Sequence, residues 1–198
     1  YSNSKSCSEL VTHSYKRSFF TDNEGGIIVP ISTARAGNVI GGGDFAKDRI
    51  IPDCVRAAAN HEDIIVRNPI STRPYQHVLE PLYAYLLIAM KQYENSRYAG
   101  CYNVGPDDVD CFQTRALVDL FVRKWGENMK WIDKYDGGPH EANFLKLDCS
   151  KMKSTFGWSP RWNLEEAIEK IVEWSKIWID GKDVRECMDK QIQEFLGI

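Results

Sequence analysis

The side chains best suited to chemistry in this sequence are Tyr1 and Lys5, which stand four residues apart. In a helix, that spacing places both on one face, one turn from each other. A lysine ammonium stabilises the ionised form of a neighbouring tyrosine, and such a pair can exchange a proton with a hydroxyl group near neutral pH. The spacing alone is a weak signal, because ordinary helix surfaces also carry it, so its weight depends on the rest of the chain.

Hydrophobic periodicity predicts the elements that would position this pair. Residues 1–18 read as a helix whose apolar stripe contains Cys7, Leu10, Val11 and Tyr15. Residues 27–36 read as a buried strand, although Pro30 conflicts with that because proline lacks a ladder donor. A glycine-rich loop follows at 37–43. Beyond it we expect helices at 50–60, 80–93, 112–125, 150–156, 164–179 and 184–196, strands at 64–66, 101–104 and 130–132, and an irregular extended segment at 68–78. The alternation favours an α/β fold with a parallel sheet.

Composition limits the classes of function. The chain has 198 residues and a net charge of -3, so nothing in its charge suggests nucleic acid or an anionic membrane as a partner. Its longest apolar run, residues 84–90, is far too short to cross a bilayer. Six scattered cysteines form no C-x-x-C pair, which argues against a metal site. Without a secretory signal, these cysteines are expected to be reduced, buried thiols in a cytoplasm.

The glycines of this chain do not form a dinucleotide fingerprint. No G-x-G-x-x-G follows any predicted strand, although an α/β nucleotide-binding half normally opens with that turn. The run GGGD at residues 41–44 lacks the required spacing. We therefore interpret it as a flexible loop rather than a phosphate cradle.

The order of several short motifs carries more information than any one of them. After Tyr1 and Lys5 come RAGNVIGG (35–42), DRIIP (48–52), RPYQHVLE (73–80), YNVGP (102–106) and HEANFLKLDCSKMKSTFGWSP (140–160). This succession resembles the C-terminal part of an extended short-chain dehydrogenase/reductase that acts on nucleotide sugars. The stretch RNPISTRPYQHVLEP points to the dehydratases of this family that use a CDP-linked sugar. Relatives that use dTDP-glucose tend to carry Arg-Asp-Trp where this chain has Arg73, Pro74 and Tyr75.

The resemblance implies a fold and a reaction. Residues 1–198 would be the C-terminal part of one NAD(P)-binding domain: the last portion of a Rossmann-type, doubly wound parallel sheet plus a smaller α/β substrate-binding lobe. The N-terminal dinucleotide-binding portion would be absent, so the chain reads as a fragment that is inactive alone. The intact enzyme would convert CDP-glucose to CDP-4-keto-6-deoxyglucose with bound NAD, for deoxysugar and O-antigen lipopolysaccharide synthesis.

The same resemblance assigns roles to residues of this sequence. Tyr1 would take the proton from the sugar 4-hydroxyl, and Lys5 would hold the nicotinamide ribose and favour the tyrosinate. Arg73 would pair with the substrate diphosphate, for which its planar fork of donors is suited. The other substrate-binding candidates are Asn38, Arg49, Asn103, His140 and Glu141.

Two other functions remain open at this level. A 4-epimerase of the same family would use the same tyrosine and lysine without dehydration, and a sugar-nucleotide-binding module would bind without catalysis. The expected partners are CDP-glucose or a related nucleotide sugar and further copies of the intact enzyme, with no nucleic acid, membrane or metal. The expected location is the cytoplasm.

Overall fold

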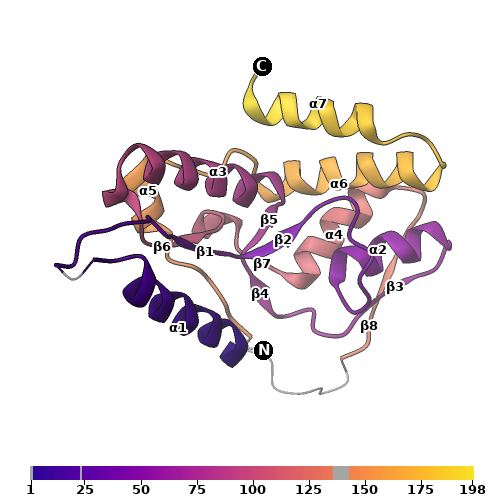
Figure 1. Ribbon diagram of the computed structural model, residues 1–198. Helices are drawn as coiled ribbons and strands as arrows, with labels where there is room; N and C mark the ends of the chain where they lie inside the picture. The colour runs from indigo at the N-terminus through magenta and orange to yellow at the C-terminus, as the bar shows by residue number, and fades with distance from the viewer. Residues whose placement is uncertain (1, 23, 136–142) are drawn as a thin grey trace.

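The structure is a computed structural model that describes residues 2–22, 24–135 and 143–198 (Figure 1). Its first element, α1 (Ser2–Phe19), lies beside the ladder formed by β1 (Thr33–Ala36) and β6 (Cys101–Val104). An ion pair between Glu9 and Arg35 ties the helix to β1. The predicted N-terminal helix is therefore confirmed from Ser2 onward, while Tyr1 lies outside the described residues.

In the part of the chain that the structure describes, the strands form four two-stranded ladders, three of them parallel. Strand β1 pairs with β6, β2 (Asn38–Ile40) with β5 (Tyr75–His77), and β3 (Ile64–Val66) with β8 (Trp131–Asp133). The antiparallel ladder joins β4 (Thr72–Arg73) to β7 (Phe112–Gln113). This parallel pairing, with helices between β2 and β3, between β5 and β6 and between β7 and β8, confirms the predicted α/β class.

Helices cover these ladders and close two apolar cores. The remaining helices are α2 (Ile50–Ala59), α3 (Leu79–Glu94), α4 (Thr114–Trp125), α5 (Ser150–Phe156), α6 (Leu164–Ile179) and α7 (Arg185–Leu196), with short 3₁₀ turns η1 (Ser96–Tyr98) and η2 (Asp108–Asp110). The larger core lies among β2, β3, β5, α2, α4 and α6, and includes the fully buried Phe121. The smaller core lies among β6, α3 and α5. The β2–β5 ladder and the β1–β6 ladder therefore pack on different cores.

Three predictions about the strands are wrong in instructive ways. The segment at 27–36 is a strand only from Thr33, and Ile28 before it is 60% exposed, because Pro30 cannot extend a ladder. The expected loop at 37–43 contains β2, and the irregular segment at 68–78 contains β4 and β5 on either side of Pro74. Short strands interrupted by glycine or proline give little periodicity, so the sequence did not distinguish them from loops.

The cysteine prediction needs a correction as well. All six cysteines are free thiols, but Cys7 and Cys101 are exposed rather than buried. Cys54 is fully buried in the larger core, and burial strongly raises the pKa of its thiol. Such a thiol packs as a small apolar side chain and stays protonated.

Candidate active site at the strand junction

The parallel ladders meet where the chain changes its pairing partner at Gly37. Up to Ala36 the chain pairs with β6, and from Asn38 it pairs with β5. The Gly37 N–H donates to the Val104 carbonyl at 2.9 Å, and the Asn38 N–H donates to the Pro74 carbonyl at 2.9 Å. A Cβ at Gly37 would lie 2.5 Å from the Pro74 oxygen, so the close approach requires glycine.

This junction brings three of the predicted substrate-binding residues close together in the fold. Asn38 opens β2 at the junction, Arg73 directly precedes Pro74, and Asn103 directly precedes Val104. The junction lies at the carboxyl ends of β1 and β6, where the pairing order changes. In open α/β folds, ligands bind outside the carboxyl ends of parallel strands. The structure thus places residues from three distant sequence segments at one candidate site.

Arg73 is the most deeply buried of these residues. Arg73 is only 6% exposed, and its guanidinium donates a hydrogen bond to the Thr72 carbonyl at 3.0 Å. The Thr72 N–H in turn donates to the Asn143 carbonyl at 2.8 Å. Segment 143–145 therefore lies alongside β4. His140 and Glu141, which the sequence interpretation also assigned to substrate, lie outside the described residues.

The remaining candidates differ in how they are held. Asn103 is half-buried in β6, and its side-chain amide donates to the Asp148 carbonyl at 3.0 Å, so it also fixes the segment before α5. Lys5 is exposed on the first turns of α1. Asn38 is half-buried beside Tyr75 on β5. The pairing of Lys5 with Tyr1 stays a prediction.

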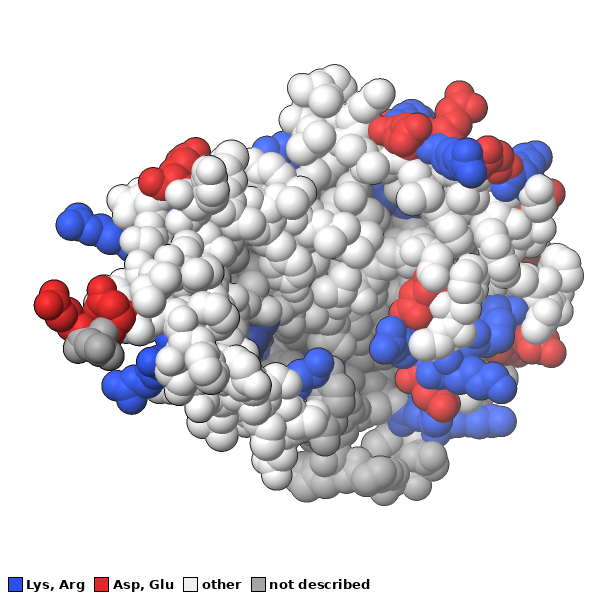
Figure 2. Space-filling model, in the orientation of Figure 1, with Lys and Arg blue, Asp and Glu red and all other residues white. Residues whose placement is uncertain are grey.

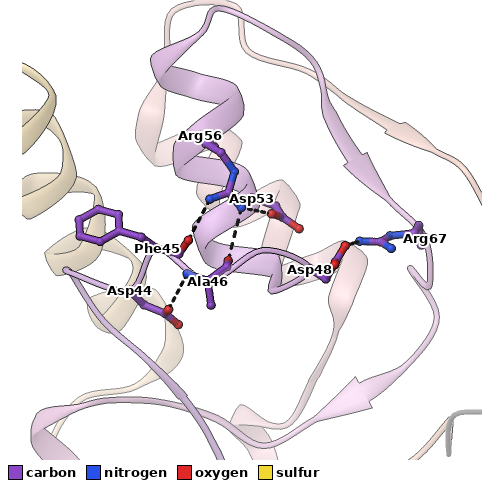
Figure 3. Close-up of polar contacts among 7 residues, drawn as sticks. All are labelled: Asp44, Phe45, Ala46, Asp48, Asp53, Arg56 and Arg67. Atoms are coloured by element: carbon purple, nitrogen blue, oxygen red, sulfur yellow. Dashed lines mark hydrogen bonds and ion pairs between the residues drawn. The ribbon is translucent and has the colours of Figure 1, made fainter.

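Arg49 directly precedes α2, at the end of a loop that polar contacts anchor to this helix. Figure 3 shows these contacts. Arg56 on α2 donates to the carbonyls of Phe45 and Ala46, at 3.2 and 3.4 Å. Asp44 accepts from the Ala46 N–H at 3.0 Å and pairs with Arg49 at 3.0 Å. The Arg49 side chain is exposed and forms its ion pair with Asp44 at the surface. The structure therefore does not bring Arg49 into the junction.

The glycines at 41–43 serve packing. A Cβ at Gly42 would overlap the ring of Trp174 on α6, and a Cβ at Gly41 would lie 2.8 Å from the Val78 side chain. A pyrophosphate-binding turn opens a helix, whose N-terminus faces the phosphates. The chain here packs against α6 instead. The loop is packed where the sequence predicted a flexible one. Within the described residues, Lys5 is left as the candidate for contacting a nicotinamide cofactor.

Strand β5 carries buried polar residues that the sequence interpretation did not identify as structural. Gln76 is 3% exposed, and Glu80 just beyond the strand is 1% exposed. One carboxylate oxygen of Glu80 accepts from the backbone N–H groups of Arg161 and Trp162, both at 2.8 Å, and burial raises the pKa of this carboxyl. No sequence signal identified these residues, because Gln76 lay in the segment expected to be irregular and Glu80 was expected only as the start of the helix at 80–93.

His77 is buried beside the same loop. Its ring makes an edge contact with Trp162 at 4.9 Å between centroids, and one ring nitrogen accepts from the Leu79 N–H at 3.3 Å. Burial, assisted by the charge of Lys170, lowers the pKa of His77 to about 4. The imidazole is therefore neutral near pH 7 and packs against Trp162 in this position.

The surface and the polar clusters give little further indication of function. Figure 2 shows acidic and basic side chains interspersed over one end of the molecule, while the middle of this face is largely uncharged. No group of three or more potential metal-ligating side chains occurs in the described part of the chain. Among the described helices, none combines the length and apolarity needed to cross a bilayer.

Comparison with known proteins shows strong similarity to one enzyme over the whole chain. No family model matches the chain. It is 46% identical over 202 aligned residues to CDP-glucose 4,6-dehydratase of Salmonella typhimurium, covering 100% of this chain and 55% of that protein. It is 22% identical to dTDP-D-glucose 4,6-dehydratase of Mus musculus, covering 88% of this chain and 46% of that protein. The chain thus spans about half the length of the curated relatives it matches.

Solved structures share the fold at lower identity. dTDP-glucose 4,6-dehydratase from Bacillus anthracis, in complex with NAD, matches with a TM-score of 0.69 and 18% identity over 89% of this chain and 51% of that one. UDP-glucose 4-epimerase from Thermotoga maritima, with UDP-glucose, matches with a TM-score of 0.72 and 21% identity over 90% of this chain and 54% of that one. The fold is therefore that of the corresponding halves of these enzymes.

Proposed function

We propose that this chain is the C-terminal part of a nucleotide-sugar 4,6-dehydratase of the extended short-chain dehydrogenase/reductase family. The intact enzyme would convert CDP-glucose to CDP-4-keto-6-deoxyglucose. The observation that carries this proposal is the 46% identity, over the whole chain, to a CDP-glucose 4,6-dehydratase. The fold of the solved dehydratase with NAD supports it.

The strand junction would bind the sugar diphosphate. Arg73 would donate two parallel hydrogen bonds to it, and the fixed fork of a guanidinium matches this task better than an ammonium does. Asn38, on the adjacent strand, would donate its side-chain amide to the same group. Asn103 would orient the substrate from the end of β6. Arg49, on the anchored loop, would need to leave its pair with Asp44 to reach a phosphate.

The proton chemistry would belong to Tyr1 and Lys5. Bound NAD would supply the hydride chemistry, holding a hydride from C4 of the sugar until it is returned to C6. Tyr1 would accept the proton of the 4-hydroxyl, and Lys5 would bind the nicotinamide ribose and favour the tyrosinate. Because Gly41–Gly43 pack on α6, we propose that the pyrophosphate of NAD is held by a portion of the enzyme outside this chain.

A turnover assay on the intact enzyme tests the proposal. Incubation with CDP-glucose should yield a 4-keto-6-deoxy sugar nucleotide that has lost one water, which mass spectrometry and NMR detect. dTDP-glucose and UDP-glucose, at equal concentration, serve as competing substrates and should turn over more slowly. Absence of any water loss from CDP-glucose would contradict the proposal.

The same assay separates the second candidate, a 4-epimerase, which the fold similarity to a UDP-glucose 4-epimerase supports. An epimerase would change the configuration at C4 without loss of mass. A non-catalytic binding module would bind CDP-glucose and leave it unchanged. The 46% identity to a dehydratase favours dehydration over both.

The biological setting follows from the proposed substrate. We place the enzyme in the cytoplasm, as a homo-oligomer that makes deoxysugar precursors of O-antigen lipopolysaccharide. The exposed apolar residues of α1, Leu10, Val11 and Tyr15, support association with another protein surface. Light scattering on the intact enzyme measures the oligomeric state, and a monomer would contradict the homo-oligomer.

A further inference from the structure

Gln76 links the two ladders that meet at the strand junction. It lies in the middle of β5 and is only 3% exposed. Its side-chain amide donates to the Val104 carbonyl at 2.9 Å. The same oxygen accepts the N–H of Gly37 at 2.9 Å. The end of β6 is therefore held both by the backbone of the strand crossing and by a side chain from β5.

The presence of a glutamine here costs stability. A buried amide must replace its hydrogen bonds to water, and an apolar side chain of similar length would avoid that cost. The side-chain oxygen of Gln76, Oε1, is buried, and it has no hydrogen-bond partner among the residues that the structure describes. The side chain is thus poorly satisfied as a core residue. What it contributes is a defined connection between two strands that belong to different cores.

The connection bears on the candidate site because its residues lie on different ladders. Arg73 leads through Pro74 into β5, which pairs with the strand that carries Asn38. Asn103 lies on β6, in the other ladder. One ligand can contact Arg73 and Asn103 together only if the two ladders keep a fixed register. The Gln76 side-chain amide joins the two ladders by its hydrogen bond to the carbonyl of Val104, the residue after Asn103.

We propose that Gln76 is a positioning residue for substrate binding, which sets the register of Arg73 and Asn38 relative to Asn103. This inference rests on the proposed function, because it concerns the site that would take a nucleoside diphosphate sugar. Gln76 does not itself need to touch the ligand. Its removal should therefore weaken ground-state binding more than it slows the chemical step.

The test compares two buried glutamines in the intact enzyme. Gln76→Met keeps the length of the side chain and removes the amide. Gln191→Met is the matched control, because Gln191 is 5% exposed and its amide donates to the Lys170 carbonyl at 3.0 Å, on α6 and α7 rather than at the junction. Calorimetric titration with CDP, the KM and kcat for CDP-glucose, and thermal unfolding are measured for both variants and the wild type.

Gln76→Met should weaken CDP binding and raise KM about three- to tenfold, the loss expected for one hydrogen bond, with kcat within about twofold of the wild type. Gln191→Met should lower the thermal midpoint and leave CDP affinity within about twofold. Unchanged CDP affinity in Gln76→Met, or an equal loss in both variants, would overturn the inference. A wild type that neither binds nor converts CDP-glucose would instead overturn the proposed function, and the inference with it.

A second measurement needs no variant. If the junction positions the ligand contacts, CDP binding to the wild type should slow hydrogen exchange at the Gly37 amide at least threefold, because that N–H shares the Val104 carbonyl with Gln76. The amide of Gly126, which donates to the Val122 carbonyl at the C-terminal end of α4, serves as the internal reference. Exchange at Gly37 that CDP does not slow would count against Gln76 as a positioning residue.

Discussion

Gly37 lies so close to Pro74 that a single added carbon would stand 2.5 Å from the proline carbonyl oxygen. Gly37→Ala must therefore push the β1–β2 crossing away from β5. We expect the free energy of unfolding to fall by about 1–3 kcal/mol, the range for overpacking, and CDP affinity to fall with it because Asn38 is displaced. Denaturant titration and calorimetry measure the two effects.

Gly100→Ala is the matched control for this substitution. The nearest atom to a Cβ there is the Lys151 ammonium nitrogen at 3.0 Å, the mobile end of a long side chain. The alanine should be accommodated by a shift of that side chain, with stability changed by about 0.5 kcal/mol or less. If both alanine variants behave alike, the contact between Gly37 and Pro74 does not constrain the junction.

Arg73 should act as a ground-state anchor for the diphosphate. Loss of a charge-assisted hydrogen bond costs about 1.5–3 kcal/mol, so Arg73→Ala should weaken CDP-glucose binding roughly 10- to 150-fold. Arg73→Lys should recover only part of this, and the change should appear mainly in KM. Arg97→Ala, at the exposed η1 turn, controls for loss of one positive charge. Equal CDP affinity in the wild type and Arg73→Ala would exclude the anchor.

His77 should make the protein sensitive to acid. Its pKa is about 4 in the folded chain and near 6.5 when unfolded, so the unfolded state binds more protons between these values. The free energy of unfolding should therefore fall as the pH drops from about 6.5 to about 4, by up to about 3 kcal/mol. His77→Phe should be less sensitive in that window. His61→Asn, at an exposed turn with φ 56°, should behave like the wild type. Parallel pH profiles for the wild type and His77→Phe would contradict this.

Glu80 should stabilise the turn before α6. Its carboxylate accepts two backbone N–H bonds, so Glu80→Ala leaves the N–H groups of Arg161 and Trp162 without this acceptor and should cost about 2–4 kcal/mol. Glu80→Gln keeps one carbonyl acceptor and should cost less. Because burial raises the pKa of Glu80, its contribution to stability is largest at low pH and declines as the pH rises through that pKa. The Gln variant should lack this decline in urea titrations between pH 4 and about 7.

The 198-residue chain on its own should bind NAD weakly or not at all. The expectation follows from Gly41–Gly43, which pack on α6 and Val78 and offer no backbone cradle for a pyrophosphate. Isothermal calorimetry of the isolated chain with NAD measures this, with CDP as the comparison ligand. Micromolar NAD affinity for the chain would show that another part of it binds the dinucleotide.

The long helices were predictable because their apolar positions repeat along many turns. The predicted helix at 164–179 coincides with α6 (Leu164–Ile179), whose start is fixed by the reciprocal capping bonds of Asn163 and Glu166. The predicted helix at 80–93 differs from α3 by one residue at each end. For these helices the local pattern and the tertiary packing agree, so the sequence alone predicts their positions.

The junction was not predictable, because its elements are short and their pairing is non-local. Strand β2 has three residues, and its partner β5 lies about forty positions later, beyond α2, β3 and β4. No period appears in three residues, and the register depends on Gly37 approaching Pro74. The resemblance to a family singled out Asn38, Arg73 and Asn103 individually. The contact that joins their ladders, through Gln76, became visible only in three dimensions.

The segment from Thr33 to Ile40 belongs to both ladders, with Gly37 as its midpoint. A rotation of the β2–β5 ladder relative to the β1–β6 ladder would therefore change the dihedral angles of this segment at Gly37, where the pairing partner changes. The hydrogen bonds that the Gly37 N–H and the Gln76 side-chain amide donate to the Val104 carbonyl oppose that rotation. If domain closure accompanies catalysis in the intact enzyme, its amplitude at this point should be small. The loops around the junction should then carry most of the movement.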